Sequence, residues 1–117
     1  MQRILVKDLI GQNAITLDDG EKIFNLIHQS LLHKEAVELD FNGVEVFASP
    51  FFNAGIGRLL NDLKPEVLNK YLKFEHLSDF GARVLRRVIE NAKDYYSSTS
   101  DQRHMIDRAV ANDFVAV

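Results

Sequence analysis

The sequence predicts a small α/β domain in which a sheet of about four strands carries helices on one or both faces. Residues 37–42 and 72–77 alternate between apolar and polar side chains, which is the period of a strand with one buried face. Residues 18–34 and 79–96 instead repeat their apolar side chains at the spacing of an amphipathic helix. Segments of the two kinds follow one another along the chain, and this order indicates an α/β fold.

Size and composition narrow the range of functions. The chain has 117 residues, of which 46% are hydrophobic and 26% charged, as expected of one globular domain. It contains no cysteine, which excludes disulfide scaffolds, zinc ribbons and cysteine nucleophiles. The net charge of -3 argues against a nucleic-acid partner. No stretch approaches the roughly 20 apolar residues that span a bilayer, and Lys7 and Asp8 do not fit a signal peptide. We therefore expect a cytoplasmic protein that does not associate with membranes.

The first half of the chain is expected to contain three strands and one helix. Residues 2–6 and 14–17 have the composition of short strands, with a connector at 8–13. Asp18 is placed to cap a helix over 18–34, and Glu21 can reach back to complete a capping box. Residues 37–42 form the third strand, Asn42-Gly43 is a turn signal, and residues 44–47 continue in an extended path.

The next predicted helix starts at Ser49, whose hydroxyl would cap it, with Pro50 in the first helical position. Gly55 and Gly57 would let this helix approach the sheet closely. Its buried stripe is predicted to consist of Phe52, Ile56, Leu59, Leu60 and Leu63.

The remaining elements follow in order. A short helix over 66–71 and a strand over 72–77 lead to a last helix over 79–96, capped by Ser78. The predicted apolar face of that helix is Phe80, Val84, Leu85, Val88, Ile89 and Ala92. Among all elements, we expect these core residues: Phe41, Phe52, Ile56, Val84 and Val88.

Residues 1–96 are predicted to be one domain. Residues 97–117 are predicted to be a linker followed by a C-terminal helix or a loose tail, and the sequence does not decide between the two.

Patterns that mark catalytic or metal sites are weak. The four histidines lack the spacing of metal ligands. Ser49 is not in a Gly-x-Ser-x-Gly elbow, and residues 55–57 have neither the third glycine of a dinucleotide loop nor a Lys-Ser/Thr pair. We therefore expect no metal, no cofactor and no enzymatic activity.

Residues 37–53 are the most informative segment: a half-buried strand, a turn, and a serine at a helix start. Free N–H groups and the helix dipole favour negative charge there, and a phosphoryl group on Ser49 would add nearly two negative charges. Ser49 is therefore either a plain cap or a charge switch. Asp40 should end a central strand near Ser49 and accept hydrogen bonds from N–H groups of the following loop.

This segment resembles the signature of STAS domains (sulfate transporter and anti-sigma factor antagonist). Their pattern is a strand end Asp-Leu-Ser-Gly-Val followed by a helix start Asp-Ser-Ser-Gly, and residues 40–44 read Asp-Phe-Asn-Gly-Val. More closely, residues 39–44, 49–54 and 72–77 are similar to a bacterial STAS-like family of poorly characterised function. The order of strands and helices over residues 1–96 also fits that fold.

The chain departs from the anti-sigma factor antagonists at the helix start. Residues 48–51, Ala-Ser-Pro-Phe, take the place of Asp-Ser-Ser-Gly. The second serine, which a partner kinase phosphorylates in the antagonists, is Pro50 here. Only Ser49 remains to accept phosphate.

The resemblance implies a non-catalytic regulatory signalling module that docks a protein partner, either a histidine-kinase-like ATPase or an anti-sigma factor. The alternative is a small-ligand or nucleotide sensor that uses the same helix start as an anion site. The candidate phosphorylation or docking residues are Asp40, Asn42, Gly43, Ser49, Pro50, Phe51 and Asn53.

Overall fold

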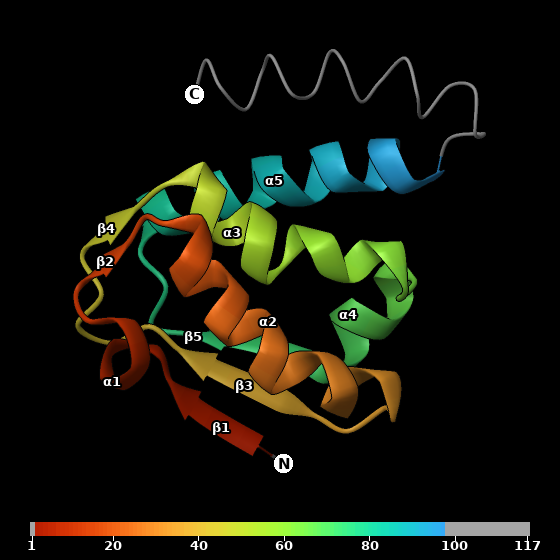
Figure 1. Cartoon of the computed structure of the whole chain (residues 1–117), viewed down its shortest axis with the longest axis horizontal. Coiled ribbons are helices and arrows are strands. Elements are labelled where there is room, and N and C mark those ends of the chain that lie inside the picture. The colour runs from red at the N-terminus through yellow and green to blue at the C-terminus, as the bar shows by residue number, and fades with distance from the viewer. Residues whose placement is uncertain (1, 98–117) are drawn as a thin grey trace.

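Three short strands form a parallel sheet in the lower part of the molecule as drawn in Figure 1. A computed structural model describes residues 2–97. In it, β3 (Val37–Asp40) lies between β1 (Gln2–Leu5) and β5 (Leu72–Glu75). The strands β2 (Asn13–Ala14) and β4 (Val46–Phe47) form a separate parallel pair. The predicted α/β class is therefore confirmed, but a single four-stranded sheet is wrong, because β4 pairs with β2 after the chain has turned away at Gly43.

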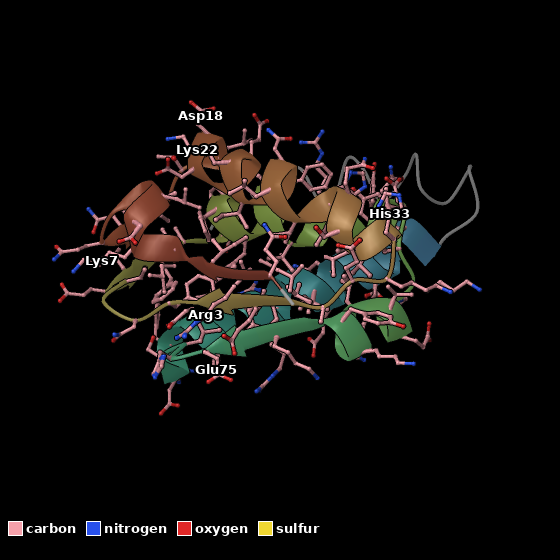
Figure 2. All side chains as sticks on the ribbon, turned by 90° about the horizontal axis from the view of Figure 1, so that it is seen from below. Arg3, Lys7, Asp18, Lys22, His33 and Glu75 are labelled. Carbon is pink, nitrogen blue, oxygen red and sulfur yellow. The ribbon has the colours of Figure 1, made fainter. Side chains whose placement is uncertain are left out.

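The period-two alternation places apolar side chains on one face of the larger sheet and charged side chains on the other. Ile4 and Leu39 are in register and buried, and Phe74, next to Leu39, packs against the same core. On the other face the charged side chains of Arg3 and Glu38 are in register and form an ion pair of 3.1 Å. Figure 2, seen from below, shows β1, β3 and β5 side by side, with Arg3 and Glu75 labelled along them.

The helices that follow β1 and β2 begin at other residues than predicted. Val6 begins a short helix, α1 (Val6–Ile10), where a strand end and a connector were expected. The helix α2 (Leu17–Leu32) is capped by Thr16, whose Oγ1 accepts a hydrogen bond of 3.1 Å from the Asp19 N–H. The predicted Asp18 cap is wrong because β2 ends early and the helix begins before Asp18.

The helix predicted from Ser49 is broken into two pieces: α3 (Ser49–Gly55) and a 3₁₀ turn, η1 (Gly57–Asn61). Its predicted stripe is nevertheless buried throughout. The break lies at Ile56, between two glycines that favour the helix less than any residue but proline.

Glycine permits a close approach between helices, not between a helix and the sheet as predicted. A Cβ added to Gly20 of α2 would lie 2.3 Å from the Phe51 carbonyl oxygen of α3. A Cβ on Gly55 would lie 3.2 Å from the Gly20 carbonyl oxygen, and one on Gly57 would meet Val88 of α5. Figure 1 shows α2 and α3 side by side above the sheet.

The last elements match their predictions closely. The helix α4 (Pro65–Tyr71) leads directly into β5, and α5 (Asp79–Ser97) begins after Ser78. The Ser78 Oγ accepts a hydrogen bond of 3.1 Å from the Gly81 N–H, as a cap should. Phe80 is the exception on the predicted apolar face, because 55% of it is exposed.

Aromatic side chains fill the centre of the core. The Phe52 ring stacks on Phe47 at a centroid distance of 5.8 Å and lies 6.1 Å from Phe41. Of the five predicted core residues, four are buried, and Val84 is partly buried against the same cluster.

The predicted linker and C-terminal helix or tail over residues 97–117 lie outside the described residues, apart from Ser97, which ends α5. Within residues 2–97, no helix is both long enough and apolar enough to cross a membrane.

Candidate functional site

Asp40 is the centre of a polar cluster at the carboxyl end of the sheet. It ends β3, and only 3% of the residue is exposed. Its Oδ2 accepts a hydrogen bond of 2.6 Å from Arg3 of β1, and its Oδ1 accepts one of 2.9 Å from the Asn42 N–H. The same Oδ1 lies 2.9 Å from Nδ1 of His76, the residue after β5. The predicted bond to the following loop is confirmed, whereas none of these partners lies on α3.

These contacts keep Asp40 ionised. The Asn42 N–H, the Arg3 guanidinium and the His76 ring together lower the pKa of Asp40 from 3.8 to about 2, and burial opposes them only partly. Because an ionised carboxylate only accepts hydrogen bonds, His76 must donate through Nδ1–H. The neutral ring therefore carries its lone pair on Nε2.

His76 is held in an uncommon backbone conformation. Its φ is +56°, in the left-handed region that few residues other than glycine adopt. The side chain is 57% exposed although Nδ1 is bound to Asp40. Non-glycine residues in this region often mark functional positions.

Lowering the pH should destabilise the folded state by protonating Asp40. Because folding lowers this pKa, the carboxylate stabilises the folded state above pH 3.8, and that contribution is lost as the pH falls towards 2. We expect the free energy of unfolding to fall more steeply in this range for the wild type than for Asp40→Asn. Urea titrations at a series of pH values measure the difference. Parallel pH profiles for the two proteins would contradict this assignment.

The turn after Asp40 is tightly built. Gly43 has φ +86°, and the Val44 N–H donates a hydrogen bond of 2.9 Å to the Phe41 carbonyl. A Cβ on Gly43 would lie 2.7 Å from Cδ of Lys7, so the lysine side chain passes over the turn. Asn42 and Gly43 are exposed, as a docking role requires.

The start of α3 differs from the prediction. Ala48 occupies the capping position without a side-chain hydrogen bond, and Ser49 is already helical and only 9% exposed. The predicted Ser49 cap is therefore wrong. Phe51 is buried, Asn53 is half-buried, and Pro50 is exposed. A negative charge at Ser49 would enter a largely buried position, so Ser49→Asp tests stability as much as docking.

Exposed apolar side chains surround the β2–β4 pair. The Ala48 N–H donates to the Ala14 carbonyl at 2.9 Å, and this brings the ends of β2 and β4 together. Gly81 lies against the Phe47 ring, which brings the start of α5 to β4. We call the exposed residues at this end the β2–β4 surface: Ile15, Leu17, Val46, Pro50 and Phe80.

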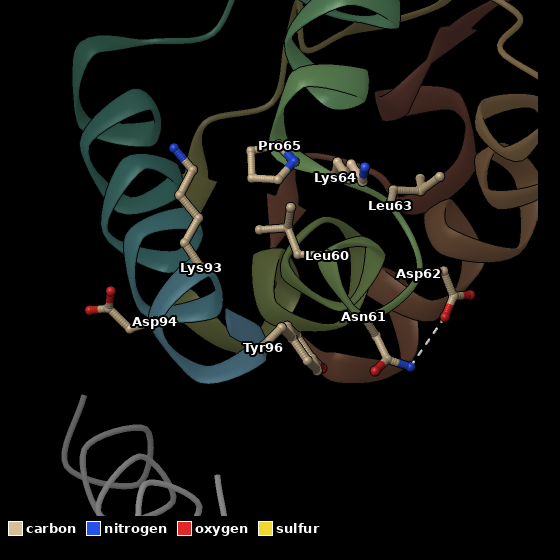
Figure 3. Close-up of a pocket in the computed structure, with 9 residues that line it drawn as sticks. All are labelled: Leu60, Asn61, Asp62, Leu63, Lys64, Pro65, Lys93, Asp94 and Tyr96. Carbon is tan, nitrogen blue, oxygen red and sulfur yellow. Dashed lines mark hydrogen bonds between the residues drawn. The ribbon is translucent and has the colours of Figure 1, made fainter. Parts of the chain in front are cut away.

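A pocket of about 360 Å³ lies elsewhere, between the end of η1, the start of α4 and the end of α5. Leu60, Leu63 and Pro65 line it together with Lys64 and Lys93 (Figure 3). None of the predicted site residues lines this pocket. Within residues 2–97, no group of three His, Asp or Glu side chains could hold a metal ion.

Arg3, Lys7 and His76 were not among the predicted site residues. Arg3 lies on β1 and His76 follows β5, and the parallel pairing with β3 brings both to Asp40. Lys7, in α1, instead lies over Gly43. The motif similarity at residues 72–77 included His76, but no local pattern in the sequence pairs it with Asp40.

The comparisons identify one family. A family model described as a STAS-like domain of unknown function (DUF4325) matches residues 19–82, from the first turn of α2 to the start of α5. No curated protein and no solved structure matched the chain significantly.

Proposed function

This chain belongs to the family of STAS-like domains of unknown function, and on that premise we propose that it is a non-catalytic regulatory module that docks a protein partner. The docking site would be the β2–β4 surface, at the start of α3, together with the adjoining turn at Asn42 and Gly43. By resemblance to anti-sigma factor antagonists, the partner is a histidine-kinase-like ATPase or an anti-sigma factor.

One observation carries the proposal: exposed apolar residues lie on β4, between β2 and α2, and at the starts of α2 and α5, elements that adjoin the segment with the family signature. Val46 is 44% exposed and Phe80 is 55% exposed, although single exposed apolar residues alone would need no explanation. Leu17 begins α2, and Ile15 lies between β2 and α2; both are exposed. Clustered apolar groups with polar neighbours are typical of a protein-binding surface.

The Asp40 cluster supports this role by fixing the neighbouring turn. Asp40 holds the Asn42 N–H, while Gly43 adopts a conformation that other residues rarely adopt. A turn held in one conformation loses little entropy on binding, which favours affinity.

The alternative anion site at the same helix start has less support. Pro50 lies in the first turn and has no N–H to offer an anion. The side chain of Ser49 is largely buried, and α3 has only seven residues.

A charge on the β2–β4 surface should weaken docking. We expect Val46→Glu to reduce affinity about tenfold or more, because a carboxylate would have to be desolvated in an apolar contact. The partner is first captured from a host extract with the wild-type chain and identified by mass spectrometry. It is then purified and titrated against both proteins by calorimetry.

Leu32→Glu is the matched control, since Leu32 is 39% exposed but lies at the far end of α2. At 1.5 Å per helical residue it is about 22 Å from Leu17. The control should bind like the wild type. Equal affinities for all three proteins would refute docking at this surface, and a partner of neither class would refute the partner assignment alone.

A further inference from the structure

We propose that His76 is a phosphoryl-accepting residue, with Nε2 as the nucleophile and Asp40 as the residue that positions the ring. This inference does not depend on the β2–β4 surface. It concerns a different part of the same domain, where a covalent modification would change the charge at the carboxyl edge of the sheet.

The first support is the geometry of the ring. Nδ1 lies 2.9 Å from a carboxylate oxygen that also accepts the Asn42 N–H, so the ring has a fixed partner and a fixed tautomer. Nε2 keeps its lone pair, and the side chain that carries it is 57% exposed. A nucleophile needs both features: a free lone pair and access for the donor.

The second support is that Asp40, which positions the ring, is itself held by other groups. Arg3 binds the other oxygen of Asp40 at 2.6 Å and also pairs with Glu38 at 3.1 Å. Asp40 is thus held by a guanidinium on one side and the imidazole on the other. Glu75, in register with Asp40, is the acidic neighbour that a phosphoryl group would have to tolerate.

The third support is that His76 lies outside the pocket and is open to a donor. His76 does not line the pocket between η1 and α5, and no metal-binding cluster forms within residues 2–97. A small substrate would not be enclosed at His76, whereas a phosphoryl donor needs only an exposed nucleophile. The left-handed backbone at φ +56° holds the side chain in this place at a conformational cost.

The chemical step balances without a redox partner. The Nε2 lone pair forms an N–P bond while the donor's bond from phosphorus to nitrogen or acyl oxygen breaks, and the leaving group takes that electron pair. With phosphoramidate, ammonia leaves. The ring keeps its Nδ1 proton and becomes cationic, and the Asp40 carboxylate stabilises that charge, as the aspartate does in a Ser-His-Asp triad.

The test uses the purified chain and phosphoramidate. Intact-protein mass spectrometry follows the gain of a phosphoryl group, and peptide mapping assigns it. We expect His76 to be modified about tenfold faster than His33, an exposed histidine that Figure 2 shows well away from Arg3. NMR of the product should show the phosphoryl group on Nε2. Equal rates at the two histidines, or a product on Nδ1, would overturn the proposal.

Variants separate a positioning role from a structural one. His76→Gln should remove the fast phase, and His33→Gln should leave it unchanged. Asp40→Asn keeps the shape but not the charge, so the rate at His76 should fall about tenfold. An unchanged rate in folded Asp40→Asn would show that Asp40 does not assist. If that variant does not fold, the site of attachment in the wild type still decides the proposal.

Discussion

Replacing Phe52 with alanine is expected to lower the free energy of unfolding by about 3–5 kcal/mol, a large part of the stability of a small domain. Phe52 is fully buried, stacks on Phe47 and meets Phe51 edge-on at a centroid distance of 5.3 Å. Its removal would leave a cavity that neighbouring elements cannot close, since they meet through rigid aromatic rings. Urea denaturation monitored by circular dichroism measures the loss.

Phe80→Ala is the matched control, because the same side chain is removed from an exposed position on α5. It should change the free energy of unfolding by no more than about 0.5 kcal/mol. A loss below about 1 kcal/mol for Phe52→Ala would mean that the core can collapse around the missing ring, which would contradict its central place.

Gly20→Ala is the second large effect that we expect, a loss of about 1–3 kcal/mol. The added Cβ would come 2.3 Å from the Phe51 carbonyl oxygen and 2.9 Å from Cβ of Ala54, so α2 and α3 would have to separate. This result opposes the ordinary preference of helices for alanine, which on its own would stabilise α2 by about 1 kcal/mol. Thermal unfolding of the purified variant gives the sign directly.

Gly55→Ala provides the ranking control. Its added Cβ would lie 3.2 Å from the Gly20 carbonyl oxygen, which a small shift can relieve. The loss should therefore be smaller than for Gly20→Ala. A stabilised Gly20→Ala protein would show that the two helices can separate without loss of packing.

The sequence predicted the structure best where the stabilising interactions join residues that are close in the sequence. Alternation at residues 37–42 predicted β3 because a strand with one face in the core requires it. Ser78 was correctly predicted as a cap, since its hydroxyl is three residues from the N–H that it binds. The family signature at residues 39–54 was recognised from its residues, and the family model covers it.

Prediction was weakest where distant segments decide the outcome. Asp18 and Ser49 both have good capping side chains, yet Thr16 and Ala48 occupy the capping positions. The preceding strands end shortly before them, at Ala14 and Phe47. The spacing of apolar residues on α5 predicted that Phe80 is buried. The first turn of α5 lies beyond the core, however, and Phe80 is exposed. In the candidate site, Asp40 was predictable because its loop contact is local, whereas its contact with Arg3 depends on strand pairing.

The order of the larger sheet also bears on aggregation. Among residues 2–97, β3 lies in the middle and β1 and β5 are edge strands, and an unpaired edge can add a strand from another molecule. Each edge strand carries a cationic side chain on the charged face, Arg3 on β1 and Lys73 on β5. A second copy that approached either edge in parallel would bring like charges together. Arg3 holds Asp40 within the domain, and its charge on an edge strand would also oppose edge-to-edge growth between domains.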